Sequence, residues 1–185
     1  SLIPNGCDLD LFNQDKVHAS QQSLSKLQTK FTIVFTGTHG QANGVGAILD
    51  VAALLQDREE ISFLLIGDGA LKPDLVESSK RRELNNVYFE SPLPKHSLAD
   101  LLPECSIGLQ VLANFPAFYY GTSPNKFFDY IASGLPVITN YPGWIADLIN
   151  EYNCGIAVRP DDAEAFAHAI ITIINSPDLM KKMGQ

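Results

Sequence analysis

Residues 123–138 read S-P-N-K-F-F-D-Y-I-A-S-G-L-P-V-I, a stretch that predicts a short helix followed at once by a buried strand. Ser123 is a favoured N-cap residue, and Pro124 suits the first helical position, where its missing N–H would be unpaired in any case. Gly134 suits the position just after the helix, where the backbone often turns left-handed. The predicted helix is therefore bounded at both ends.

The side chains of this helix separate into an apolar side and a polar side. Apolar residues recur at the three- and four-residue spacing of one helical face, which predicts contact with the core: Phe127, Phe128, Ile131 and Ala132. Polar residues line up along another face and predict a polar ridge: Lys126, Asp129 and Ser133.

The start of the helix is a candidate anion site. Backbone N–H groups and the helix dipole favour a negative charge there, and Lys126 adds a full positive charge in the first turn. Asp129 lies one turn further along, roughly 5 Å, a distance that suits a ribose next to a bound phosphate. The alternative is a capped core helix in which Lys126 and Asp129 form a surface pair worth at most about 0.5 kcal/mol.

Length and composition limit the class of protein. The chain has 185 residues, of which 45% are apolar, enough for one well-buried domain but cramped for two. Its formal net charge of −8 argues against nucleic acid or an anionic membrane as the main partner, since both select for clustered Lys and Arg. No apolar run approaches the ~18 to 20 residues of a membrane span, so we expect no membrane insertion by this chain. Ser1 in place of Met suggests a piece of a longer protein.

The cysteines indicate the redox setting. There are three, Cys7, Cys105 and Cys154, and they are far apart in the sequence with no C-x-x-C pair. This pattern suggests neither a disulfide framework nor a zinc site. We expect reduced thiols and a cytosolic location.

Short β-rich runs alternate with helical patterns along the chain. Several of the runs have almost no polar residues, which is typical of strands covered on both faces, and they lie at 32–36, 61–66, 87–89, 107–111, 136–139 and 156–158. Helical patterns lie between and after them, at 47–55, 71–84, 97–102, 124–133, 145–150 and 162–174, and another helix begins after Ser176. Strict alternation predicts an α/β fold with a doubly wound, Rossmann-like parallel sheet of about six strands and helices on both faces.

In such a sheet, ligands bind outside the carboxyl ends of the strands. Four loops follow predicted strands at that edge: G-T-H-G-Q-A-N-G-V-G at 37–46, G-D-G at 67–69, E-S-P-L-P at 90–94, and the loop that leads to Ser123. The first loop is neither a Walker A motif nor a clean G-x-G-x-x-G, so a dehydrogenase is less favoured and a tight turn is the alternative. His39 is the one histidine in these loops, and its ring could donate to a phosphate or sugar oxygen.

These motifs, taken in order, resemble the C-terminal domain of family 4 glycosyltransferases of the GT-B superfamily. The resemblance rests on I-P-N-G-C-D at 3–8, G-D-G at 67–69 and D-Y-I-A-S-G-L-P-V-I at 129–138. It implies one nucleotide-sugar-binding domain over residues 1–185, with the N-terminal acceptor domain absent from the chain. The catalytic residues are then expected mainly in that other domain, and the isolated chain is expected to be inactive.

The resemblance also assigns roles to residues. Asp129 takes the place of the second glutamate of the E-x7-E motif and contacts the ribose, while Gly121 stands where the first glutamate contacts the donor sugar. Thr38 and Asn43 stand where the family commonly has Arg and Lys, so we expect Lys126 to supply the missing positive charge. The predicted site residues are for the diphosphate Gly37, Thr38, His39, Gly40, Asn125 and Lys126; for the ribose Asp129; for the base Ser91, Pro92, Leu93 and Pro94; and for the sugar Gly121, Thr122 and Ser123.

The sequence therefore favours the donor-binding half of a retaining glycosyltransferase that uses a UDP-sugar and needs no cofactor or catalytic metal. The transferred sugar is expected to be an N-acetylated amino sugar, and the acceptor a glycan or lipid-linked molecule bound through the missing domain. We expect a cytoplasmic enzyme, peripheral to the membrane at full length, with no nucleic-acid partner. The alternatives are a GT-B-type epimerase or phosphorylase relative and a non-catalytic nucleotide-binding module.

Overall fold

The computed structural model describes residues 6–12 and 29–185. In this part of the chain, six parallel strands form one sheet in the order β3-β2-β1-β4-β5-β6. The strands are β1 (Phe31–Thr36), β2 (Ile61–Ile66), β3 (Val87–Glu90), β4 (Ile107–Gln110), β5 (Val137–Thr139) and β6 (Gly155–Ala157). The reversal of order between β1 and β4 confirms the predicted doubly wound sheet and opens a crevice at that point.

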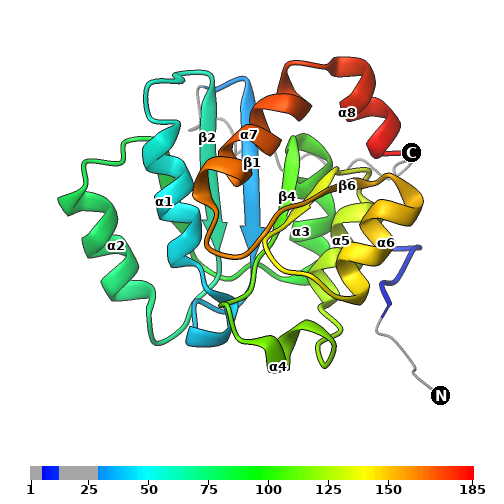
Figure 1. The fold of residues 1–185 in the computed structure, drawn as a ribbon, viewed down its shortest axis with the longest axis horizontal. Helices are drawn as coiled ribbons and strands as arrows, with labels where there is room; N and C mark the ends of the chain where they lie inside the picture. The colour runs from blue at the N-terminus through cyan, green and yellow to red at the C-terminus, as the bar shows by residue number, and fades with distance from the viewer. Residues whose placement is uncertain (1–5, 13–28) are drawn as a thin grey trace.

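Helices cover both faces of the sheet. They are α1 (Gly46–Leu54), α2 (Lys72–Arg81), α3 (Lys95–Leu101), α4 (Pro116–Tyr119), α5 (Asn125–Ala132), α6 (Trp144–Tyr152), α7 (Ala163–Ile174) and α8 (Pro177–Met183). One core packs α1, α2 and α7 against the sheet, and α1 lies beside α7 (Figure 1). A second core packs α3, α5 and α6 against the opposite face. The strand runs lack polar alternation because both faces are covered.

The predicted elements are confirmed within a few residues, and the short ones were missed. The 3₁₀ helices found among the described residues, η1 (Gln41–Asn43) and η2 (Leu102–Glu104), and the single turn α4 lie in segments that the sequence assigned to loops or to a longer helix. The predicted entry segment at residues 3–8 lies partly outside the described residues. The short elements carry too few turns to show a period, so a sequence pattern could not reveal them.

Helix α5 begins one residue later than predicted. Pro124 is its N-cap, with extended backbone angles (φ −77°, ψ 120°), and no side-chain cap hydrogen bond is made. The expected cap at Ser123 is therefore wrong. The predicted end is confirmed, because Gly134 has a left-handed φ of 72° directly after Ser133.

The faces of α5 also differ from the prediction. The predicted polar ridge is buried at Asp129 and Ser133, whereas Ile131 is 38% exposed. The cause is Tyr130, which lies over Gly108 of β4, where an added Cβ would come within 2.5 Å of the ring. The buried Tyr130 hydroxyl accepts a hydrogen bond from the backbone N–H of Thr36 at 2.8 Å. Docking this ring turns the polar side of the helix inward.

Candidate functional site

A cleft of about 700 Å³ lies at the carboxyl edge of the sheet. In Figure 1 the labelled strand β1 ends toward the lower edge of the view, which is this edge of the sheet. The loops after β1, β2, β3 and β4 and the start of α5 all line the cleft, so the predicted convergence of these loops is confirmed. The cleft-lining residues that the sequence singled out are Gly37, Thr38, Pro92, Leu93, Thr122, Ser123, Asn125, Lys126 and Asp129. His39, Gly40, Ser91, Pro94 and Gly121 do not line it.

Lys126 is the positive charge of the cleft. Its Nζ lies 4.1 Å from the centroid of the Phe35 ring and donates to Asn43 Oδ1 at 3.2 Å. Among residues 6–12 and 29–185, no carboxylate lies within 4.0 Å of this ammonium group. Burial lowers the pKa of Lys126 from 10.5 to about 7. A half-buried ammonium without a counter-charge is a site that an anion can complete.

The first loop is shaped around that lysine. Gly37 has a φ of +136°, which favours glycine, and an added Cβ would come within 3.2 Å of Lys126 Nζ and displace the end of that side chain. Asn43 donates from Nδ2 to the Thr38 carbonyl at 2.8 Å and accepts from Lys126 through Oδ1. Asn43 thereby connects the first loop to α5, a connection that sequence reasoning did not identify.

Asp129 lies in the cleft and forms an ion pair that the sequence did not predict. Both of its carboxylate oxygens accept from Lys95 Nζ, at 2.7 and 2.8 Å. The Asp129 side chain is 7% exposed, whereas that of Lys95 is 43% exposed. Lys95 begins α3 directly after the loop predicted to hold the base. Because Lys95 neutralises Asp129, the net positive charge near the start of α5 comes from Lys126.

His39 does not take the position predicted for it. Its ring is fully buried between Phe35 and Phe89, with centroid distances of 5.8 and 6.1 Å. Its backbone N–H donates to the Asp68 carbonyl at 2.8 Å. Burial, followed by the charge of Lys72, lowers the pKa of His39. The predicted contact of this residue with a phosphate is corrected, because both the ring and the N–H face the protein.

The G-D-G loop after β2 lines the cleft at Gly67 and Asp68 and also supports the first loop. Gly67 and Gly69 have φ values of 148° and 154°, and an added Cβ at either would collide with the backbone of the first loop. Lys72 Nζ donates to the carbonyls of Gly67 and Glu90, at 2.6 and 2.8 Å. These contacts hold the loops after β1, β2 and β3 in one arrangement.

The remaining cleft residues form an apolar end and a polar floor. Pro92 and Leu93 lie with Leu98 at the end predicted for the base. Gln110 lies on the floor, fully buried, and donates from Nε2 to the Tyr141 hydroxyl at 3.0 Å, while its Oε1 has no hydrogen-bond partner among the described residues. The indole Nε1 of Trp144 donates to the Thr122 carbonyl at 2.8 Å and fixes the segment that precedes α5.

The comparisons with known proteins establish the family. A family model described as glycosyl transferases group 1 matches residues 30–176, so the chain belongs to this family. A comparison with curated protein sequences found no match. Family membership confirms the predicted GT-B glycosyltransferase class, and the numbered family 4 stays a prediction.

Solved structures share the fold at low identity. The C-terminal domain of the group 1 protein LpcC from Francisella tularensis has a TM-score of 0.76 at 17% identity, covering 97% of this chain and 93% of that one. Sucrose-phosphate synthase from Thermosynechococcus elongatus has 0.79 at 21% identity, covering 100% of this chain and 46% of that one. Alr3699/HepE from Anabaena, in complex with UDP-glucose, has 0.78 at 17% identity, covering 97% and 49%. The chain spans about half the length of the last two.

Residues 6–12 and 29–185 contain no group of three or more His, Cys, Asp or Glu side chains placed to hold a metal ion. No helix in this part of the chain is both long enough and apolar enough to cross a membrane.

Proposed function

We propose that the chain is the donor-binding domain of a retaining glycosyltransferase that uses a UDP-sugar, without a cofactor or catalytic metal. Membership of the glycosyl transferases group 1 family supports the transferase. The observation that carries the donor role is the cleft at the crossover of the sheet, with Lys126 half-buried in it and no carboxylate partner among the described residues. Crystals of the structurally similar HepE contain UDP-glucose, which supports a UDP-linked donor.

The proposed donor lies across the cleft from α5 to the loop after β3. The diphosphate lies at the start of α5, where the backbone N–H groups of Asn125 and Lys126 have no partner within the helix. Lys126 Nζ binds its oxygens together with the backbone of Gly37 and Thr38. The ribose contacts Asp129, and the base lies against Pro92 and Leu93.

Lys126 also has a proposed role in the reaction. When the sugar leaves, negative charge develops on the diphosphate oxygen that held it. The ammonium group and the positive end of the helix dipole are already in place to stabilise that charge. Because the Lys126 side chain is half-buried, this interaction is stronger than it would be at a fully exposed site.

For the transferred sugar and the acceptor we propose only their chemical class and, for the sugar, the residues that contact it. Thr122 and Ser123 line the cleft beside the start of α5 and are the proposed sugar contacts, with an N-acetylated amino sugar as the transferred group. Because similar chains are about twice as long, we propose that an acceptor domain completes the enzyme and that the acceptor is a glycan or a lipid-linked molecule. A cytoplasmic enzyme, peripheral to the membrane, fits these partners. The isolated chain should bind the donor without turnover.

Calorimetry with UDP and UMP tests the proposal. A diphosphate site predicts that UDP binds at least about tenfold more tightly than UMP, because UMP lacks the second phosphate that Lys126 contacts. The variant Lys126→Ala should reduce this difference, whereas Lys80→Ala, which removes an exposed lysine on α2, should leave it unchanged. Equal binding of the two nucleotides, or no binding of either, would overturn the proposal.

A further inference from the structure

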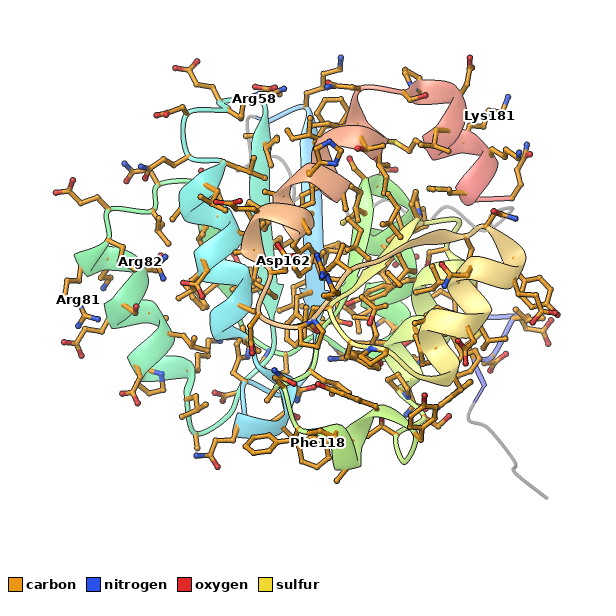
Figure 2. The ribbon with its side chains drawn as sticks, in the orientation of Figure 1. Arg58, Arg81, Arg82, Phe118, Asp162 and Lys181 are labelled. Carbon is orange, nitrogen blue, oxygen red and sulfur yellow. The ribbon has the colours of Figure 1, made fainter. Side chains whose placement is uncertain are left out.

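The loop between β4 and α5 holds aromatic rings on the outside of the molecule. Phe115 is 58% exposed and Tyr120 is 69% exposed. Phe118 is half-buried and packs edge-on against Phe115, with 5.8 Å between the ring centroids. Figure 2 shows Phe118 on α4 at the lower edge of the molecule, the edge at which the strands end. We call Phe115, Phe118 and Tyr120 the aromatic rim.

The rim is held in place by buried contacts. Between its members, Tyr119 turns inward and stacks on Tyr141, with ring centroids 6.0 Å apart and an angle of 14° between the planes. Gly143 is so close that an added Cβ would collide with the Tyr119 carbonyl. Asn114 accepts from the Tyr119 hydroxyl and donates to Asp161 at 2.6 Å. A loop fixed at these points presents its exposed rings without a large loss of conformational entropy on binding.

The aromatic rim continues directly from the cleft, and its own segment of the chain carries no charge; the carboxylate of Asp161, from another loop, accepts a hydrogen bond from Asn114 beside it. Leu112, at the start of the loop, and Thr122, two residues after Tyr120, line the cleft. The hydroxyl of Thr122 donates to the Phe118 carbonyl at 2.8 Å, which joins the rim to the cleft wall. No Asp, Glu, Lys, Arg or His occurs from residue 106 to 125, although the chain has a net charge of −8. The surface therefore suits a neutral ligand with apolar faces.

We infer that the aromatic rim binds the acceptor as a neutral glycan, by packing aromatic faces against the C–H face of a sugar ring. The inference rests on the proposed function, because the transferred sugar must lie at the Thr122 and Ser123 end of the cleft. The acceptor hydroxyl has to reach that sugar, and the rim is the surface beside it. Rigid aromatic rings bury apolar area at low entropic cost and leave the sugar hydroxyls in water.

The charge pattern favours a glycan over a membrane. Anionic membrane surfaces attract clusters of Lys and Arg, and the rim segment contains neither. A second copy of the chain would bring a like net charge to the surface. A neutral glycan needs no cluster of Lys and Arg and is not repelled by the net negative charge of the chain.

Saturation-transfer NMR on the 185-residue chain with saturating UDP tests the inference, with cellobiose and N,N′-diacetylchitobiose as probes. We expect transfer to ring C–H protons of at least one disaccharide. The double variant Phe115→Ser/Tyr120→Ser should weaken its binding at least about tenfold, because it removes two aromatic contacts. Tyr152→Ser is the matched control, since Tyr152 on α6 is also 69% exposed and outside the rim. UDP affinity should be unchanged in all three proteins.

The inference would be overturned if neither disaccharide showed saturation transfer while UDP is bound, or if the double variant and the wild type showed equal transfer. It would also be overturned if the aromatic rim bound phosphatidylcholine vesicles in place of the disaccharides, or if sedimentation showed self-association that depends on the rim. The UDP titration of the same sample separates the two proposals. If UDP itself fails to bind, the proposed function fails; if UDP binds and the disaccharides do not, only the aromatic rim assignment fails.

Discussion

The affinity for UDP should fall as the pH rises, through the titration of Lys126. In the free protein, burial lowers the pKa of this ammonium from 10.5 to about 7, so the group is increasingly neutral above pH 7. A bound diphosphate stabilises the charged form and raises the pKa again, so binding at higher pH must take up a proton. If the pKa in the complex lies above 9, affinity should fall about fiftyfold between pH 7 and pH 9, or ~2.3 kcal/mol.

Isothermal calorimetry at pH 7, 8 and 9, in two buffers of different ionisation enthalpy, measures both the affinity and the proton uptake. The diphosphate itself gains negative charge mainly near pH 6, and that change would strengthen binding rather than weaken it. Lys126→Arg is the matched control: it stays charged over this range, so its affinity should be nearly independent of pH. Lys126→Met should bind weakly at every pH. A wild-type affinity that is constant to pH 9, or a decrease with pH that persists in Lys126→Met, would show that the titration of Lys126 does not control UDP binding.

Three further results are expected. Asp129→Asn should weaken UDP at least about tenfold in calorimetry, because the carboxylate is proposed to contact the ribose. Pyrophosphate should not be weakened, since the substitution also frees the Lys95 ammonium that Asp129 neutralises; an equal loss for both ligands would contradict a ribose role. The pKa of His39 is lowered below its ordinary 6.5, so protons bind the unfolded state more readily and stability should fall below about pH 6.5. Urea unfolding at pH 5 and 7.5 should show a smaller pH dependence in His39→Met, and an undiminished one would exclude His39 as the cause. Gly108→Ala should lower the free energy of unfolding by about 1–3 kcal/mol, because the added Cβ collides with the Tyr130 ring. Gly46→Ala, with open space around the added Cβ, should not lower it. Thermal unfolding of the two variants distinguishes this collision from a general effect of replacing glycine.

The sheet could be predicted from the sequence because its strands are short apolar runs separated by helical patterns. β1 and β2 are almost entirely buried, and their lack of polar alternation in the sequence indicated strands that are covered on both faces. The convergence of four loops followed from the topology of such a sheet, with no need for side-chain detail. Lys126 and Asp129 entered the candidate site for the same reason, since both lie in the first turns of a helix at the carboxyl edge.

The details that failed depend on tertiary contacts between residues far apart in the sequence. The orientation of α5 is set by Tyr130 packing on Gly108, which no helical period can show. Lys95 meets Asp129 across 34 positions, and Lys126 meets Asn43 across 83. His39 turned out to be buried because Phe35 and Phe89 enclose its ring, and those two aromatic residues lie on different strands.

A crystal structure of the chain with UDP would show directly where the diphosphate and the ribose bind. We expect diphosphate oxygens within hydrogen-bond distance of Lys126 Nζ and of the backbone N–H groups at the start of α5, with the ribose hydroxyls at Asp129. UDP bound outside the cleft, or bound in it with the diphosphate away from Lys126, would contradict the proposed donor site.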